Sequence, residues 1–197
     1  MNIKKTSRGF TLVELVVVIG IVSLISTVTL ANFPNFRDRI ALNKESGKVA
    51  AALRNAQSFS LGVRQFASFP GPQGACDEVF QSNFPSYGVS FTAGDSAYYL
   101  FGDVNCNVGR DEGAEEVESF ILEGGVRIQE ICVDIDDETP TCGVPWTDVV
   151  YARPFPQVKI SSEAGSHASV QLNLQSRDGA TGRHVIIRNT GQVSVEN

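Results

Sequence analysis

Residues 8–33 read RGFTLVELVVVIGIVSLISTVTLANF, a stretch whose only charges are Arg8 at its start and Glu14 a short way in. The apolar run, residues 10–33, contains 24 residues, which as an α-helix would span about 36 Å. The hydrocarbon layer of a bilayer is about 30 Å thick, so the run predicts a helix that can cross a membrane with some tilt. The residues before it are basic and carry no acid, so we expect this end to stay cytoplasmic and the rest to be exported.

The residues around Gly9 carry a processing signal. An ordinary secretory signal would place a small-residue cleavage site after the apolar run, and none stands out here. The string GFTLVE (residues 9–14) instead resembles the class III signal of type IV pilins and type II secretion pseudopilins. The resemblance implies that prepilin peptidase cuts between Gly9 and Phe10 and that the new N-terminal Phe10 is methylated. The apolar helix would then remain in the mature protein.

Glu14 is the one acid of the apolar run. A carboxylate inside hydrocarbon costs about 2.5–3.5 kcal/mol on insertion scales, and a lone one indicates a function. The resemblance implies that Glu14 meets the freed amine of a neighbouring subunit's Phe10 and so sets the register of assembly. The alternative is an acid that snorkels to the membrane edge.

The rest of the chain predicts an amphipathic continuation of the helix and then a β-rich head. Val49, Ala52, Leu53 and Ala56 recur at helical spacing, which predicts a helix that continues to about Gly62. Alternating apolar residues then predict strands through Tyr87–Phe91, Tyr98–Leu100, Val126–Ile128, Val170–Leu174 and Val185–Ile187, with a terminal hairpin through Val193 and Val195.

We therefore expect an α+β fold, in which a long N-terminal helix packs on an antiparallel β-sheet head. The helix is apolar in its first half and amphipathic in its second. The expected segments are a leader at 1–9, a transmembrane or filament-core half-helix at 10–33, an amphipathic half-helix at 34–63 and a globular head at 64–197.

All four cysteines follow the apolar helix and would lie on the exported side; they are Cys76, Cys106, Cys132 and Cys142. An even number in an oxidising compartment predicts disulfides, and four cysteines allow three connectivities. A zinc site is the competing interpretation, but no CxxC pair is present. We favour Cys132–Cys142, which closes around an acidic loop, with Cys76–Cys106 as the other bridge.

Oxygen-bearing side chains alternate at Asp103, Asn105 and Asn107, with Asp111 further on, as at the start of a calcium loop. The pattern departs from an EF-hand because Val108 occupies the usual glycine position. A solvated hairpin of Asx turns is the favoured interpretation, so we expect no cofactor, with calcium as the alternative. The second acidic cluster, Asp134, Asp136, Asp137 and Glu138, is interpreted as a solvated loop.

Neither His167 nor His184 stands in a nucleophile or metal motif, so we expect a structural protein and not an enzyme. Some FimT-like pilins bind DNA through a basic C-terminal Gly-Arg-x-Arg motif, whereas this chain has Gly-Gln-Val-Ser at residues 191–194. Arg183 and Arg188 remain as candidates for a nucleic-acid patch. The chain carries 16 basic and 22 acidic residues, and loss of the leader would take its net charge from −6 to −9, which disfavours DNA.

The resemblance as a whole implies a type IV pilin-like subunit, most similar to the GspH/FimT/MshC-type minor pilins and pseudopilins. Such a subunit would be a single-pass inner-membrane protein with its head in the periplasm. It would join an extracellular pilus or a periplasmic type II secretion pseudopilus. Its partners would be other pilins, prepilin peptidase and an inner-membrane platform protein. A DNA-binding minor pilin for DNA uptake and a major pilin subunit are the alternatives.

Overall fold

The computed structural model describes residues 9–62, 64, 85–113, 115–152 and 157–196, without the side chains of residues 31–35. The chain divides into two compact units, residues 1–37 and 38–197, and each is described by itself. Helix α1 (Leu12–Leu61) contributes its first half to one unit and its second half to the other.

The first unit consists, as far as the structure describes it, of the start of α1 and the residues before it. Leu12–Leu30 has a mean hydropathy of 2.4 and is long and apolar enough to span a membrane, and none of it is buried. It is the one such helix among the described residues. Three hydroxyls in this stretch donate hydrogen bonds to carbonyls of the preceding turn: Ser26 to Val22, Thr27 to Ser23 and Thr29 to Ile25.

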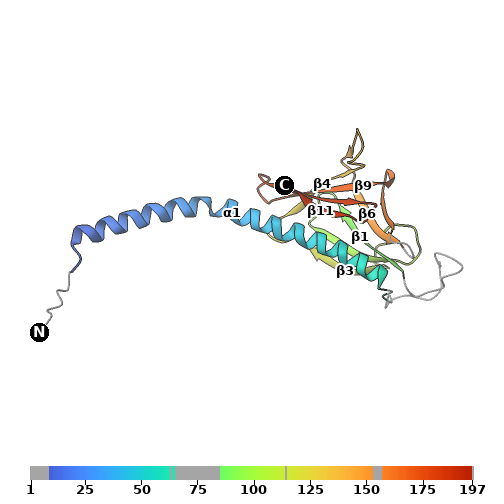
Figure 1. Cartoon of the computed structure of the whole chain (residues 1–197), viewed down its shortest axis with the longest axis horizontal. Coiled ribbons are helices and arrows are strands. Elements are labelled where there is room, and N and C mark those ends of the chain that lie inside the picture. The colour runs from blue at the N-terminus through green and yellow to red at the C-terminus, as the bar shows by residue number, and fades with distance from the viewer. Residues whose placement is uncertain (1–8, 63, 65–84, 114, 153–156, 197) are drawn as a thin grey trace, which may run out of the picture. The chain divides into compact units, whose positions relative to one another are not determined.

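The second unit joins the other half of α1 to two antiparallel sheets (Figure 1). The first sheet has the order β3-β2-β1-β6-β7-β8 and the second β11-β10-β9-β4-β5. The strands are β1 (Ser86–Thr92), β2 (Ala97–Asp103), β3 (Glu116–Ile121), β4 (Arg127–Val133), β5 (Thr141–Cys142), β6 (Trp146–Ala152), β7 (Gln157–Ser162), β8 (Gly165–His167), β9 (Ser169–Gln175), β10 (Gly182–Arg188) and β11 (Val193–Glu196). The fold is therefore α+β, as expected.

A single core lies between the helix and the inner faces of both sheets. The helix contributes Leu42, Val49, Ala52, Leu53 and Ala56, the apolar stripe that the sequence predicts together with one residue a turn or two earlier. Fully buried aromatic and aliphatic residues of the sheets face this stripe, among them Tyr87, Phe91, Leu100, Ile131, Leu172 and Val185. Removal of this apolar area from water is what holds the amphipathic half-helix on the head.

Polar contacts fix the position of the helix along the first sheet. The Ser60 hydroxyl accepts a hydrogen bond from the Tyr87 N–H at 2.8 Å, and the Phe59 ring meets the Tyr87 ring edge-on at 5.6 Å. Near the other end of this half-helix, Lys44 pairs with Glu123 at 2.6 Å. In Figure 1 the second half of α1 accordingly lies along the strands of the head.

Candidate functional site

The described N-terminal segment begins with two residues outside the helix and a helix cap. Gly9, Phe10 and Thr11 precede α1, and the Phe10 side chain is 81% exposed. The Thr11 hydroxyl accepts a hydrogen bond from the Glu14 N–H at 3.2 Å, so Thr11 is the N-cap. Cutting between Gly9 and Phe10 would leave the cap and the helix intact, because both lie after the cut.

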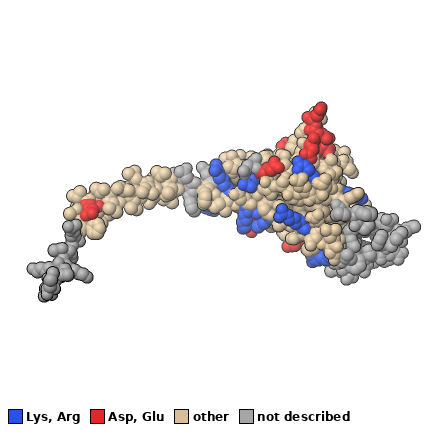
Figure 2. Space-filling view, viewed as in Figure 1, with Lys and Arg blue, Asp and Glu red and all other residues tan. Residues whose placement is uncertain are grey.

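Glu14 occupies the first turn of α1 and is exposed. In Figure 2 the apolar half of the rod is tan apart from one acidic patch near its start. Within the described part of a single chain, no side chain pairs with the Glu14 carboxylate. A negative charge in the first turn is stabilised by the helix dipole, but that gain is below 1 kcal/mol at an exposed position.

The loop between β2 and β3 is held by its own side chains. The Asn105 Oδ1 accepts the Asn107 N–H at 3.1 Å, and the Asn107 Oδ1 accepts the Gly109 N–H at 2.8 Å, which makes two successive Asx turns. The amide groups of both asparagines donate to the Asp111 carboxylate. Three of the four calcium candidates, Asn105, Asn107 and Asp111, thus hydrogen-bond to one another, and this supports the Asx-turn interpretation of the pattern.

Asp103, the fourth calcium candidate, lies inside this loop and is 2% exposed. Burial, then repulsion from Glu115, raises the pKa of Asp103 to about 6, although N–H groups of the loop favour its charged form. Glu115 is itself buried and accepts the N–H groups of Val104 and Asp111 at 3.0 Å each. Two buried carboxylates therefore share one loop, and a charge on Asp103 destabilises it.

We expect Asp103→Asn to raise the free energy of unfolding at pH 7 by about 3 kcal/mol, because raising the pKa by roughly two units costs the charged form about 1.4 kcal/mol per unit. The folded pKa lies above the unfolded one. The stabilisation from protonating Asp103 is therefore present below about pH 4 and is lost as the pH rises through about 6. Denaturant unfolding at pH 5 and pH 7 measures this, with the exposed Asp137→Asn as control. A variant no more stable at pH 7 would contradict the assignment.

The loop between β4 and β5 is closed by a disulfide between Cys132 and Cys142, the pairing that we favour from the sequence. The other favoured bridge, Cys76–Cys106, involves Cys76, which lies outside the described residues, and stays a prediction. Glu130 lies beside Cys132 and Cys142, and these make the one group of three potential metal ligands among the described residues. Because both sulfurs are consumed in the disulfide, this group offers no thiolates to a metal.

A hydrogen-bonded chain of three side chains joins this loop to the β7–β8 hairpin. The Asp134 Oδ2 lies 2.7 Å from the His167 Nδ1, and the His167 Nε2 lies 2.7 Å from the Ser162 Oγ. The sequence analysis did not find this group of three side chains, because Asp134, His167 and Ser162 form no local motif. A serine five residues before a hairpin histidine is the one signal that could have indicated part of it.

The Asp134–His167–Ser162 chain has the order of a catalytic triad, but its serine is poorly placed as a nucleophile. Ser162 is 7% exposed, and its Oγ already accepts the Ala164 N–H at 3.0 Å. Asp134 has a φ of 54° and also accepts the Ala168 N–H at 2.9 Å. Asp134 and Ser162, at the two ends of this hydrogen-bonded series, thus both accept backbone N–H groups. The arrangement suits a structural link between the two sheets.

The two arginine candidates for nucleic acid do not form one patch. Arg183 and Arg188 stand five residues apart on β10, so their side chains leave opposite faces of the strand. Arg188 donates to both carboxylate oxygens of Asp136 at 2.9 Å. That bidentate pair leaves less of its charge for a phosphate.

Comparison with known proteins places the processing segment in a defined class. The family model described as the prokaryotic N-terminal methylation motif matches residues 4–30, which include the Gly9–Phe10 junction and Glu14. The chain carries this type IV pilin signal, as expected.

The chain is also similar to the type IV major pilin protein PilA of Myxococcus xanthus (strain DK1622), at 29% identity over 89 residues. The similarity covers 45% of this chain and 40% of the relative, so the chain spans less than half the length of the curated relative it matches. No solved structure matches the chain.

Proposed function

We propose that this chain is a type IV pilin-like structural subunit, a minor pilin or pseudopilin, that is cut between Gly9 and Phe10 and assembled through its N-terminal helix. The observation that carries the proposal is the methylation motif over residues 4–30. The exposed apolar helix with one acid supports it, as does the similarity to a pilin.

Before assembly, the apolar half of α1 holds the subunit in the inner membrane, with its head in the periplasm. An inner-membrane platform protein then helps to extract the subunit from the membrane into a pilus or pseudopilus. The helix exchanges lipid for the helices of other subunits, so little apolar surface meets water. No cofactor is needed for any of these steps.

Glu14 supplies the register. In a dry filament core an unpaired carboxylate is penalised, and a neighbouring subunit's N-terminal amine is the complementary charge. A subunit that docks out of step leaves both charges unpaired, so the pair selects one axial position. Thr11 supports this by capping the helix that aims Glu14.

The proposal is tested by the intact mass of the full-length chain isolated from cells that express prepilin peptidase. The expected mature protein begins at Phe10, carries one added methyl group and contains two disulfides. A polypeptide that still begins at Met1 would overturn the proposal.

Glu14→Val is expected to leave cleavage unchanged and to abolish incorporation into filaments, measured in filaments sheared from the cells. Ser26→Val is the matched control, because it changes a polar residue of the same helix whose hydroxyl already bonds within the helix. Normal incorporation of the Glu14 variant would contradict the role of the acid. The amount of this chain in the filaments tests the minor assignment, since a major pilin would make up most of the filament.

A further inference from the structure

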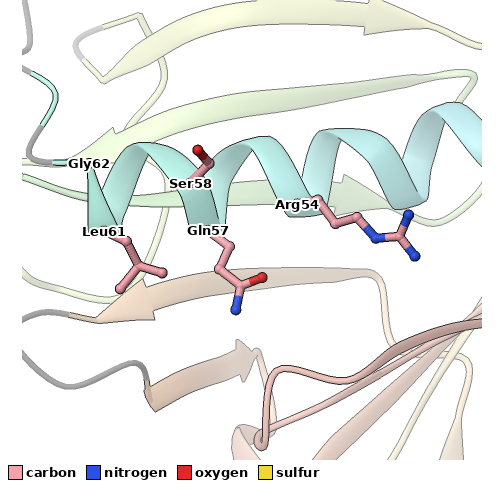
Figure 3. A pocket seen from close by; sticks show the side chains of 5 residues that line it. All are labelled: Arg54, Gln57, Ser58, Leu61 and Gly62. Atoms are coloured by element: carbon pink, nitrogen blue, oxygen red, sulfur yellow. The ribbon is translucent and has the colours of Figure 1, made fainter.

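A hollow of about 470 Å³ lies along the second half of α1, lined by Arg54, Gln57, Ser58, Leu61 and Gly62. Figure 3 shows the side chains of Arg54, Gln57 and Leu61 spaced along one side of the helix. They supply one cation and one amide that do not converge on a common point, so the hollow defines no ligand.

Three potential metal ligands do converge, on the second sheet. One ligand atom from each of Glu130, Cys132 and Cys142 lies within 4.8 Å of the other two. Ligands of a tetrahedral zinc ion lie about 3.3–3.8 Å apart, because Zn–S and Zn–O bonds are about 2.3 Å and 2.0 Å long. Small side-chain movements therefore bring the three atoms onto one ion once the sulfur atoms are free thiolates.

A β-bulge turns Glu130 onto the face of β4 that carries Cys132. Ile128 and Ile131 both belong to the core although they are three residues apart, so β4 has one residue more than its partner β9 between them. The pairing accordingly shifts between Ile128 and Glu130. With the regular two-residue period, Glu130 would face the core as Ile128 does. The bulge instead places Glu130 on the outer face with Cys132.

Asn173 on β9 fixes the Glu130 carboxylate. The Asn173 Nδ2 donates to the Glu130 Oε2 at 3.1 Å, and the Asn173 Oδ1 lies 2.7 Å from the His184 Nδ1. The amide is therefore held at both ends, with its donor toward Glu130. Hydrogen bonds of this kind to a ligand orient it in metal sites.

The backbone holds Cys142 opposite Cys132 by contacts other than the disulfide. The two residues are directly paired in the β4–β5 ladder. Just beyond them, the N–H groups of Gly143 and Val144 both donate to the Ile131 carbonyl, at 3.1 Å and 3.2 Å. The two thiols of a reduced chain would therefore stay face to face, next to Glu130.

We propose that Glu130, Cys132 and Cys142 form a zinc site in the reduced chain, and that zinc and the disulfide are alternative ways of closing the β4–β5 loop. Two thiolates and a carboxylate suit Zn²⁺, whereas Ca²⁺ and Mg²⁺ prefer oxygen ligands alone. Water takes the fourth position, on the side where Cys142 is exposed. The site exists whether or not the chain enters a filament, so it goes beyond the proposed function.

The newly synthesised chain carries both cysteines as thiols, so the zinc form precedes the disulfide. Zn²⁺ displaces one proton from each thiol as the two Zn–S bonds form. When a disulfide oxidant arrives, the exposed Cys142 sulfur attacks it and displaces one thiolate, and the Cys132 sulfur then attacks the Cys142 sulfur and displaces the second. Two electrons pass to the oxidant, both released thiolates take up protons from water, and Zn²⁺ leaves.

Alkylation of the reduced full-length chain by iodoacetamide tests the site, with the rate read at each cysteine by peptide mass spectrometry. Zn²⁺ is expected to slow alkylation of Cys132 and Cys142 by about tenfold, because the ion occupies the thiolate electrons that attack the reagent. Equal rates with and without Zn²⁺ would overturn the proposal. So would a reduced chain whose head is unfolded, by near-UV circular dichroism, both with and without the metal.

The Glu130→Gln variant is expected to lose most of this protection, since the amide that replaces the carboxylate carries no charge and is a poorer ligand for zinc. Asn173→Ala is expected to weaken Zn²⁺ binding by about tenfold, because the carboxylate is then no longer oriented. Asp137→Asn is the matched control, because it neutralises an exposed acid of the same loop that is outside the ligand group. Protection of both cysteines that is as strong in Glu130→Gln as in the unchanged chain would overturn the three-ligand site.

Discussion

Gly88→Ala is expected to lower the free energy of unfolding of the head by about 3–4 kcal/mol. Gly88 lies in β1 between β2 and β6, and a Cβ there would lie 2.8 Å from the Val149 carbonyl oxygen and 2.8 Å from the Phe101 Cζ. The carbonyl belongs to the backbone of a central strand, so it cannot move without breaking the ladder. The Phe101 ring is fully buried, so moving it aside would disturb the groups packed around it.

The measurement is denaturant unfolding of residues 38–197 with the disulfides intact. Gly47→Ala is the matched control, because that glycine is helical and exposed, and a Cβ there meets nothing within 4 Å. We expect the control to gain about 0.5–1 kcal/mol from helix propensity. A loss below 1 kcal/mol for Gly88→Ala would mean that β1 and β6 are less closely packed than the structure has them.

His167→Ala is expected to cost about 2–4 kcal/mol of unfolding free energy, because it leaves Asp134 and Ser162 without their shared partner. Burial opposes the charged form of Asp134, but hydrogen bonds from His167 and from the Ala168 N–H outweigh it and lower the pKa of that carboxyl. The contribution of the pair is therefore present above the unfolded pKa of an aspartate. It is lost as the pH falls through the lower folded value.

Unfolding of the head between pH 3 and pH 7 measures this, with Glu163→Ala as control from the same turn. The control is expected to stay within about 0.5 kcal/mol of the parent. A second measurement separates a structural link from a catalytic one. A fluorophosphonate probe labels activated serines, and we expect the buried Ser162 to stay unlabelled, so labelling at that position would refute the structural interpretation.

Strands could be predicted where large apolar residues alternate with small or polar ones along the sequence. Strands β1, β9 and β10 coincide with the alternations at Tyr87–Phe91, Val170–Leu174 and Val185–Ile187. Strand β6 could not, since Val149, Val150 and Tyr151 are consecutive apolar residues and leave no alternation in the sequence. Strand β3 lacks the signal for the opposite reason, because most of its residues are exposed at the sheet edge.

The candidate sites differ in whether their residues are close together in the sequence or are brought together only by folding. Gly9, Phe10 and Glu14 are close together in the sequence, so the resemblance of this short string to a known signal could be seen before folding, and the family model matches the same residues. The Asp134–His167–Ser162 chain joins residues up to 33 apart through tertiary packing, and no pattern in the sequence marks it.

The hydroxyls of Ser26, Thr27 and Thr29 affect how well the apolar half of α1 suits both a membrane and the core of a filament. Each donates a hydrogen bond to a carbonyl of its own helix, at 2.8 to 3.1 Å, so none requires an acceptor from another molecule. Under the proposed function this segment lies first among acyl chains and later among apolar side chains, and neither surrounding offers many hydrogen-bond partners to its hydroxyls. Because these hydroxyls are satisfied within the helix, the segment would need no new hydrogen bonds when it leaves lipid for a filament core.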